Sequence, residues 1–165
     1  MTKLLVCLLG LFFAAQVSTA LTLACLNDYS EYAVDHRAVA KSRSVVEELT
    51  NVELIEPWTV RRDRLRREAD AGGDYKVRND LASALIHTGD LRTAIQILEE
   101  IEKTNPGLYR TASNLGTAYE LAGEPAKALD WIRKGIDRNP ESHEGSEWIH
   151  VRILEKKVSG TKVSS

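Results

Sequence analysis

The residues with the most evident potential for chemistry are two histidines and a glutamate near the C-terminus. His143, Glu147 and His150 are spaced by four and three residues, so a helix would carry them on one face. Imidazole and carboxylate groups are suitable ligands for a transition metal. However, no fourth ligand and no supporting hydrogen-bond partner can be named, and His150 falls on the side of the helix that is expected to pack. We therefore predict no metal and no cofactor, and metal binding by this helix is the least favoured hypothesis.

Motifs for catalysis are absent from the sequence. Gly72 and Gly73 form an isolated pair without the spacing of a phosphate-binding loop, and no serine stands in a nucleophile-elbow pattern. Cys25 is remote in the sequence from His87, so these two residues do not make a recognisable pair of nucleophile and base. We expect that the protein is not an enzyme.

A dense group of arginines could bind phosphate groups, anionic lipid or an acidic partner. The group consists of Arg61, Arg62, Arg64, Arg66 and Arg67. Acidic residues at 63, 68 and 70 lie among them and favour pairing within one helix, so a solvated helix face is the main interpretation and an acidic partner the alternative. The formal net charge of the whole chain is only -2, which argues against a general nucleic-acid binder.

The first 24 residues have the features of an export signal. Lys3 precedes an unbroken apolar run from Leu4 to Ala15, and the residues that follow end in small side chains that suit a signal peptidase. The run is shorter than the roughly 20 residues that span a bilayer, so cleavage after Ala20 or Ala24 is favoured over an uncleaved membrane anchor. We expect an exported protein, in the periplasm or at an extracytoplasmic membrane face.

Cys25 directly follows this signal. The segment Thr22-Leu23-Ala24-Cys25 resembles a bacterial lipobox, in which the cysteine becomes the lipidated N-terminus, although Thr22 and Leu23 depart from that pattern. Lipidation of Cys25 and simple cleavage are therefore left as alternatives. Residues 25–56 are interpreted as a linker that contains a helix over 37–50.

Self-comparison of the remaining sequence reveals a tandem repeat, in which residues 75–108 and 109–142 align without a gap. The two copies share seven identical positions. The identical pairs are Tyr75/Tyr109, Leu81/Leu115, Ala84/Ala118, Gly89/Gly123, Ala94/Ala128, Asn105/Asn139 and Pro106/Pro140. This constant period predicts two copies of one structural unit.

The shared residues fit a pair of helices joined by a tight turn. Leu81 and Leu85 fall at helical spacing and give the first helix an apolar face. Gly89 and Gly123 follow the last periodic residue, where a helix end commonly needs a left-handed backbone conformation that glycine adopts at little cost. Pro106 and its equivalent in the second unit then stop the second helices.

The pattern resembles the tetratricopeptide repeat family, which has the same period and the same small, apolar, glycine and proline positions. The resemblance implies an all-α fold, a short right-handed superhelical array of antiparallel helix pairs with capping helices, over residues 57–158. Its parts would be an N-terminal capping helix at 57–71, repeat 1 at 75–108, repeat 2 at 109–142 and a C-terminal capping helix at 143–158, before a flexible tail at 159–165.

The resemblance also implies where a ligand would bind. Tetratricopeptide arrays typically bind an extended peptide or a partner helix along a concave groove lined by the first helix of each unit. Carried onto this sequence, the groove positions are Lys76, Asn79, Ser83, Ile86, Arg110, Ser113, Thr117 and Glu120. The basic residues would attract carboxylates of the partner, and the small polar residues would hydrogen-bond its backbone.

The leading functional hypothesis is an exported scaffold or adaptor that binds a protein or peptide through this groove. The alternative is a lipid-anchored structural subunit of an envelope-assembly complex, attached through Cys25. Self-association is a further alternative, because an array of this kind usually needs about three units to bury a continuous core. Nucleic acid is not expected as a partner, and membrane contact is expected only through the N-terminus.

Overall fold

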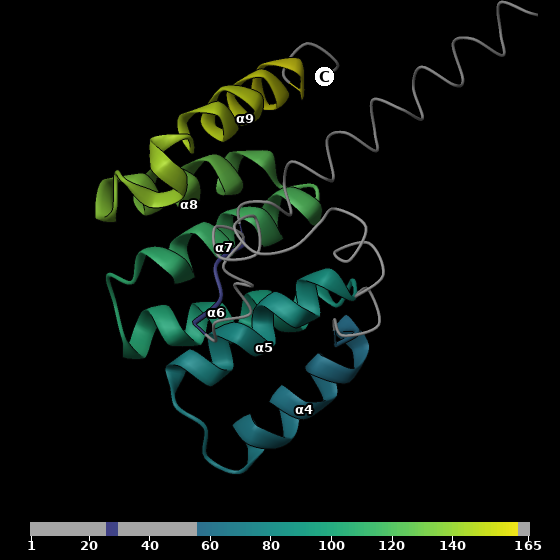
Figure 1. Cartoon of the computed structure of the whole chain (residues 1–165). Helices are drawn as coiled ribbons and strands as arrows, with labels where there is room; N and C mark the ends of the chain where they lie inside the picture. The colour runs from purple at the N-terminus through teal and green to yellow at the C-terminus, as the bar shows by residue number, and fades with distance from the viewer. Residues whose placement is uncertain (1–25, 30–55, 162–165) are drawn as a thin grey trace, which may run out of the picture.

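The computed structural model describes residues 26–29 and 56–161, and within them the chain is all α-helical (Figure 1). The predicted all-α class is therefore confirmed for these residues. The helices are α4 (Trp58–Asp70), α5 (Tyr75–His87), α6 (Leu91–Thr104), α7 (Tyr109–Leu121), α8 (Pro125–Arg138) and α9 (Trp148–Thr161), with a 3₁₀ turn, η2, at Ser142–Gly145. The predicted export signal, Cys25 and the predicted helix at 37–50 lie outside the described residues.

The helices are stacked in chain order. Each packs against the next, from α4 at one end of Figure 1 to α9 at the other, and α5 also contacts α7. The bounds of α7 and α8 each lie one repeat length after those of α5 and α6. The sequence repeat thus corresponds to a repeated pair of helices, in which α5 and α7 are the first members.

In each pair, one glycine turn joins the first helix to the second. Gly89 has φ of 87° and Gly123 has φ of 81°, the left-handed conformation that the sequence predicts for them. The Gly89 N–H donates to the Ile86 carbonyl at 3.1 Å and the Asp90 N–H donates to the Leu85 carbonyl at 2.9 Å, which ends α5 in a Schellman motif. The same two bonds recur around Gly123, at the equivalent positions of the second unit. The side chain of Asp90 then caps α6 by accepting from the Thr93 N–H at 3.3 Å.

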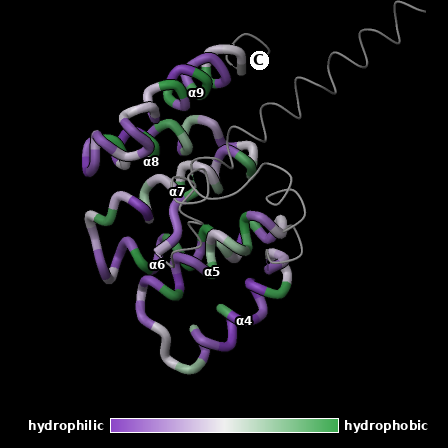
Figure 2. Tube along the Cα trace, viewed as in Figure 1, coloured by the Kyte–Doolittle hydropathy of each residue, from purple (hydrophilic) through white to green (hydrophobic). Residues whose placement is uncertain are grey.

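The core runs along the stack between successive helices, and Figure 2 shows hydrophobic residues distributed through all of them. Leu85, Leu98, Leu115, Ile132 and Leu154 are each 0% exposed, and burial of such a side chain contributes roughly 1.5–3 kcal/mol. The small residues at the predicted helix crossings, which include Ala94 and Ala128, are equally buried. No helix in the described ranges combines the length and apolarity needed to cross a bilayer.

The C-terminal helix begins later than the pattern predicts. The sequence predicts a helix from residue 143, whereas α9 starts at Trp148 and continues through Ser159 and Gly160, which are assigned to the flexible tail in that prediction. His143 and Glu144 have φ of 52° and 57°, and a residue in this left-handed region cannot continue an α-helix. The Ser142 hydroxyl donates to the Glu147 carboxylate at 3.2 Å, which closes the turn just before α9.

Candidate functional site

The segment Leu26–Tyr29 lies against the middle of the helical stack, drawn in purple across α5 and α7 in Figure 1. Asn27 is only 9% exposed, and Leu26 packs against the hydrophobic core. We call the side chains that surround the segment the docking face. The docking face consists of Arg61 on α4, Tyr75, Asn79, Asp80 and Ser83 on α5, and Arg110 and Asn114 on α7.

Two asparagines hold the backbone of Asn27. The Oδ1 atom of Asn114 accepts the Asn27 N–H at 2.7 Å, and its Nδ2 atom donates to the Asn27 carbonyl at 3.0 Å. Asn79 donates to the same carbonyl at 2.9 Å, and the two asparagine side chains are linked to each other at 3.3 Å. The side-chain amide of Asn114 therefore binds both polar groups of one residue's backbone. These contacts do not depend on the side chain at position 27.

A third backbone contact involves Tyr29, whose N–H donates to the Asp80 Oδ1 atom at 2.5 Å. Asp80 stands at the same position in the first unit as Asn114 does in the second. The two units thus bind alternate N–H groups of the segment through equivalent positions.

The side chain of Asp28 forms an ion pair with Arg61, with 2.7 Å between Oδ2 and Nη2. Arg61 is 1% exposed, so its guanidinium is inside the protein. Burial raises the pKa of the Asp28 carboxyl, and the nearby Ser83 hydroxyl and Arg61 guanidinium oppose this rise only in part. The carboxylate therefore loses solvation when it enters the site, and Arg61 is its principal compensating charge.

The ring of Tyr29 lies between an aromatic edge and a cation. It meets Tyr75 edge to face, with ring centroids 5.7 Å apart and planes at 87°, and the guanidinium carbon of Arg110 is 4.7 Å from its centroid. Burial, followed by the neighbouring Tyr75, raises the pKa of the Tyr29 hydroxyl, so the ring is neutral at ordinary pH.

Three of the predicted groove residues meet the segment, namely Asn79, Ser83 and Arg110. Lys76 is exposed, whereas Ile86 and Thr117 are buried. For these last three residues, contact with a partner stays a prediction. The repeat pattern gives no indication of Asp80, Asn114 or Tyr75. The predicted solvated helix face is wrong for Arg61, because its side chain is 1% exposed.

The remaining two predicted groove residues face α9. Ser113 donates to the Glu147 carboxylate at 3.4 Å, and Glu120 accepts from His150 at 2.5 Å and also from Lys157. Burial would raise the pKa of Glu120, but the hydrogen bonds from His150 and Lys157 outweigh it and hold this pKa below its usual value. In the structure these residues connect α7 to the C-terminal helix, and their binding of a partner stays a prediction.

The histidine and glutamate spacing near the C-terminus does not assemble a metal site. His143 lies 3.6 Å from Glu147, but His150 is turned toward Glu120 on α7. Within residues 26–29 and 56–161, no three His, Cys, Asp or Glu side chains are grouped so that they could hold a metal ion. The three residues instead join the 3₁₀ turn and α9 to the rest of the stack.

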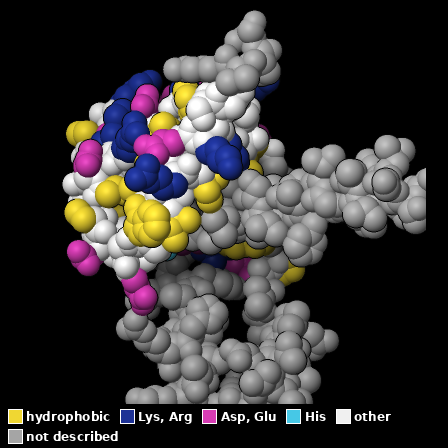
Figure 3. Space-filling view, turned by 90° about the horizontal axis from the view of Figure 1, so that it is seen from above, with side chains coloured by type: hydrophobic (Ala, Val, Ile, Leu, Met, Phe, Trp, Pro, Cys, Tyr) yellow, Lys and Arg dark blue, Asp and Glu magenta, His cyan; other side chains and the backbone are white. Residues whose placement is uncertain are grey.

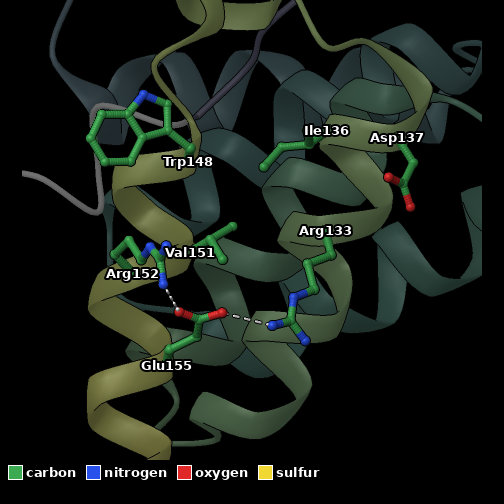
Figure 4. Close-up of a pocket in the computed structure, with 7 residues that line it drawn as sticks. All are labelled: Arg133, Ile136, Asp137, Trp148, Val151, Arg152 and Glu155. Carbon is green, nitrogen blue, oxygen red and sulfur yellow. Dashed lines mark hydrogen bonds and ion pairs between the residues drawn. The ribbon is translucent and has the colours of Figure 1, made fainter.

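A hollow of about 340 Å³ lies between α8 and α9 (Figure 4). Glu155 lines the hollow and pairs with Arg133 at 2.8 Å and with Arg152 at 3.2 Å. Trp148 lines one side and is 61% exposed. Viewed from above, Figure 3 shows basic, acidic and hydrophobic side chains interspersed on this face of the molecule. Because three of its four charged groups, Arg133, Arg152 and Glu155, pair with one another, the hollow offers less for ligand recognition than the docking face.

Comparison of the chain with protein-family models, curated proteins and solved structures finds no match. The contacts of the docking face are therefore the basis on which a function is inferred.

Proposed function

We propose that the protein is a non-catalytic scaffold or adaptor, of tetratricopeptide-like architecture, that binds an extended segment of a partner protein on its docking face. In this proposal the helices form a short right-handed array, with α4 and α9 as its capping helices. The equal offset between the helix pairs and the identical glycine turns support this architecture. The first helices of the two units, α5 and α7, supply most of the docking face.

The observation that carries the proposal is the two-point contact between Asn114 and the backbone of Asn27. Asn114 and Asn79 are both 0% exposed, and a buried side-chain amide is costly unless its donors and acceptor are used. A polypeptide backbone offers the N–H and carbonyl that these amides need. The docking face is therefore suited to a segment of protein chain, and the Leu26–Tyr29 segment is an example of such an occupant.

Binding can be measured with a fluorescent pentapeptide, Leu-Asn-Asp-Tyr-Ser, that copies residues 26–30. The full chain would carry Asp28→Lys and Tyr29→Ala, so that its own segment competes weakly; we call this variant the released chain. We expect saturable binding by fluorescence anisotropy. Addition of Asn114→Leu, which keeps the branching and the number of heavy atoms of the side chain but has no amide, should weaken binding about tenfold or more.

The control is Gln96→Leu, which also replaces a side-chain amide by an apolar side chain, at an exposed position of α6. It should leave the affinity of the released chain unchanged. A second control removes the N–H of the peptide's asparagine by an amide-to-ester replacement, which should weaken binding to the released chain but not to its Asn114→Leu derivative. Absence of binding at millimolar peptide would overturn the proposal, and equal affinity of the Asn114→Leu chain would remove Asn114 from it.

We also propose export, supported by the charge, length and composition of the first 24 residues. Cys25 directly precedes the docked segment, so lipidation there would place the docking face beside a membrane. The mass of the mature N-terminus separates the alternatives. A diacylated Cys25 would support the lipid-anchored envelope subunit, whereas an unmodified N-terminus at Leu21 would exclude it.

A further inference from the structure

The side chains around the backbone contacts indicate which segments the docking face accepts. We propose that it selects an extended segment in which an acidic residue is followed directly by an aromatic residue, and that Leu26–Tyr29 occupies the face until such a partner segment replaces it. This inference rests on the proposed function, because it assumes that a partner binds where Leu26–Tyr29 lies.

The preference for an acidic residue follows from the charges of the docking face. Arg61 and Arg110 are basic and Asp80 is acidic, so the face has one excess positive charge before Asp28 is counted. The same three residues are the charged groups that act on the Asp28 carboxyl. A carboxylate at this point balances the face, and it does so beside Arg61, which is 1% exposed and poorly solvated. A basic residue would instead bring a second buried cation against Arg61.

The preference for an aromatic residue follows from the surroundings of Tyr29. The edge-to-face contact with Tyr75 and the position of Arg110 over the ring both require a π-system. Neither contact uses the tyrosine hydroxyl, so phenylalanine should substitute for tyrosine. An aliphatic side chain could fill the space but would not attract the guanidinium in the same way.

The tethered segment competes with any partner. Leu26–Tyr29 is joined to α4 through residues 30–55, and this covalent connection gives it a local concentration that a free peptide must exceed. The affinity measured for a partner is then the intrinsic affinity multiplied by the fraction of chains in which the docking face is free. Occupation by the chain's own segment would therefore set a threshold for partner binding.

The experiment uses the pentapeptide Leu-Asn-Asp-Tyr-Ser with the full wild-type chain and with the released chain. The released chain should bind it about tenfold more tightly or better, because its own segment no longer competes. Three altered peptides test selectivity on the released chain. Changing aspartate to lysine, or tyrosine to alanine, should each weaken binding about tenfold or more, whereas changing tyrosine to phenylalanine should alter it less than about threefold.

Each outcome has a distinct meaning. If every peptide binds the released chain with the same affinity, the acidic-aromatic preference is wrong while the proposed peptide binding stands. If wild-type and released chains bind the parent peptide equally, the tethered segment is not a competitor. If no peptide binds either chain, the proposed function itself fails. Circular dichroism of the released chain checks its folding, and a chain with Asp28→Lys alone repeats the comparison if the double variant is unfolded.

Discussion

Trp58 and His87 lie face to face where α4 meets α5, with ring centroids 3.6 Å apart and planes at 12°. Burial, followed by the charge of Arg61, lowers the pKa of His87 to about 4, compared with an ordinary value of 6.5. Below pH 6.5, His87 is therefore protonated in the unfolded chain while it stays largely neutral in the folded chain. The contribution of His87 to stability is present above pH 6.5 and is lost as the pH falls toward 4.

Replacement of His87 by phenylalanine should remove this pH dependence while it keeps a ring against Trp58. Between pH 7 and pH 5 the wild-type free energy of unfolding should fall by about 1 kcal/mol more than that of His87→Phe, after allowance for the partial exposure of the imidazole. Urea denaturation at the two pH values measures the difference. Gln96→Leu, at an exposed position of α6 without a titratable group, is the control and should follow the wild type. If the free energy of unfolding of His87→Phe fell as much as that of the wild type, His87 would not be the source of this pH dependence.

Individual site residues could be predicted only in part. Asn79, Ser83 and Arg110 follow from the family resemblance, because the repeat fixes which face of the first helix they share. Asp80 and Asn114 stand one position beyond the predicted face, and the repeat pattern gives no reason to extend the site to them. They bind a segment that is as much as 87 residues away in the sequence, and no local pattern indicates such a contact.

At the scale of elements, α7 and α8 approach each other closely at Gly116. A Cβ atom there would lie 2.5 Å from both Cγ1 and Cδ1 of Ile132, and Ile132 is 0% exposed and held in the core. We expect Gly116→Val to lower the free energy of unfolding by about 2 kcal/mol, because overpacking forces these helices apart. Urea denaturation of the full chain measures this.

Gly160→Ala in α9 is the control, since a Cβ atom there meets nothing within 4 Å. Alanine should be neutral or slightly stabilising at that position, by up to about 1 kcal/mol, because it is the better helix former. If Gly116→Val were as stable as the wild type, the close approach of α7 and α8 would not constrain this position.

The helices from α5 to α8 could be predicted from sequence because two copies of the same signals reinforce each other. The glycine turns at 89 and 123 and the proline stops bracket the helices in both units. The start of α9 could not be predicted in this way. It depends on Glu147, which accepts from Ser142 beside it and from Ser113 on α7, and the second contact exists only after the helices have packed.

On the scale of the whole molecule, the docked segment and the helical stack should open independently. The hydrogen bonds to the backbone of Leu26–Tyr29 each contribute about 1 kcal/mol net, whereas ordering a residue costs about 1–2 kcal/mol. These opposing quantities are similar, so the segment should leave its site far more often than the stack unfolds.

Amide hydrogen exchange measured by NMR on the full chain tests this expectation. The Asn27 N–H, although buried and hydrogen-bonded, should exchange at least about a hundredfold faster than the N–H of Leu115 in the core of α7. Asn114→Leu should accelerate exchange at Asn27 further and leave the helical amides of α5 nearly unchanged. Equal protection of Asn27 and Leu115 would mean that the segment is an integral part of the fold.

The backbone contacts also fix the direction of the bound chain and the spacing of its contacts with the docking face. The Asn27 N–H is bound from α7 and the Tyr29 N–H from α5, so these two contacts run against the order of the units and lie two residues apart in the bound chain. A third unit would make the equivalent contact from the position one repeat length after Asn114, which is Trp148. An indole has a donor but no acceptor for a backbone N–H, so the series of equivalent backbone contacts ends with the second unit. The recognised segment should therefore bind in one direction only, and it should be no longer than the backbone contacts of two units can hold.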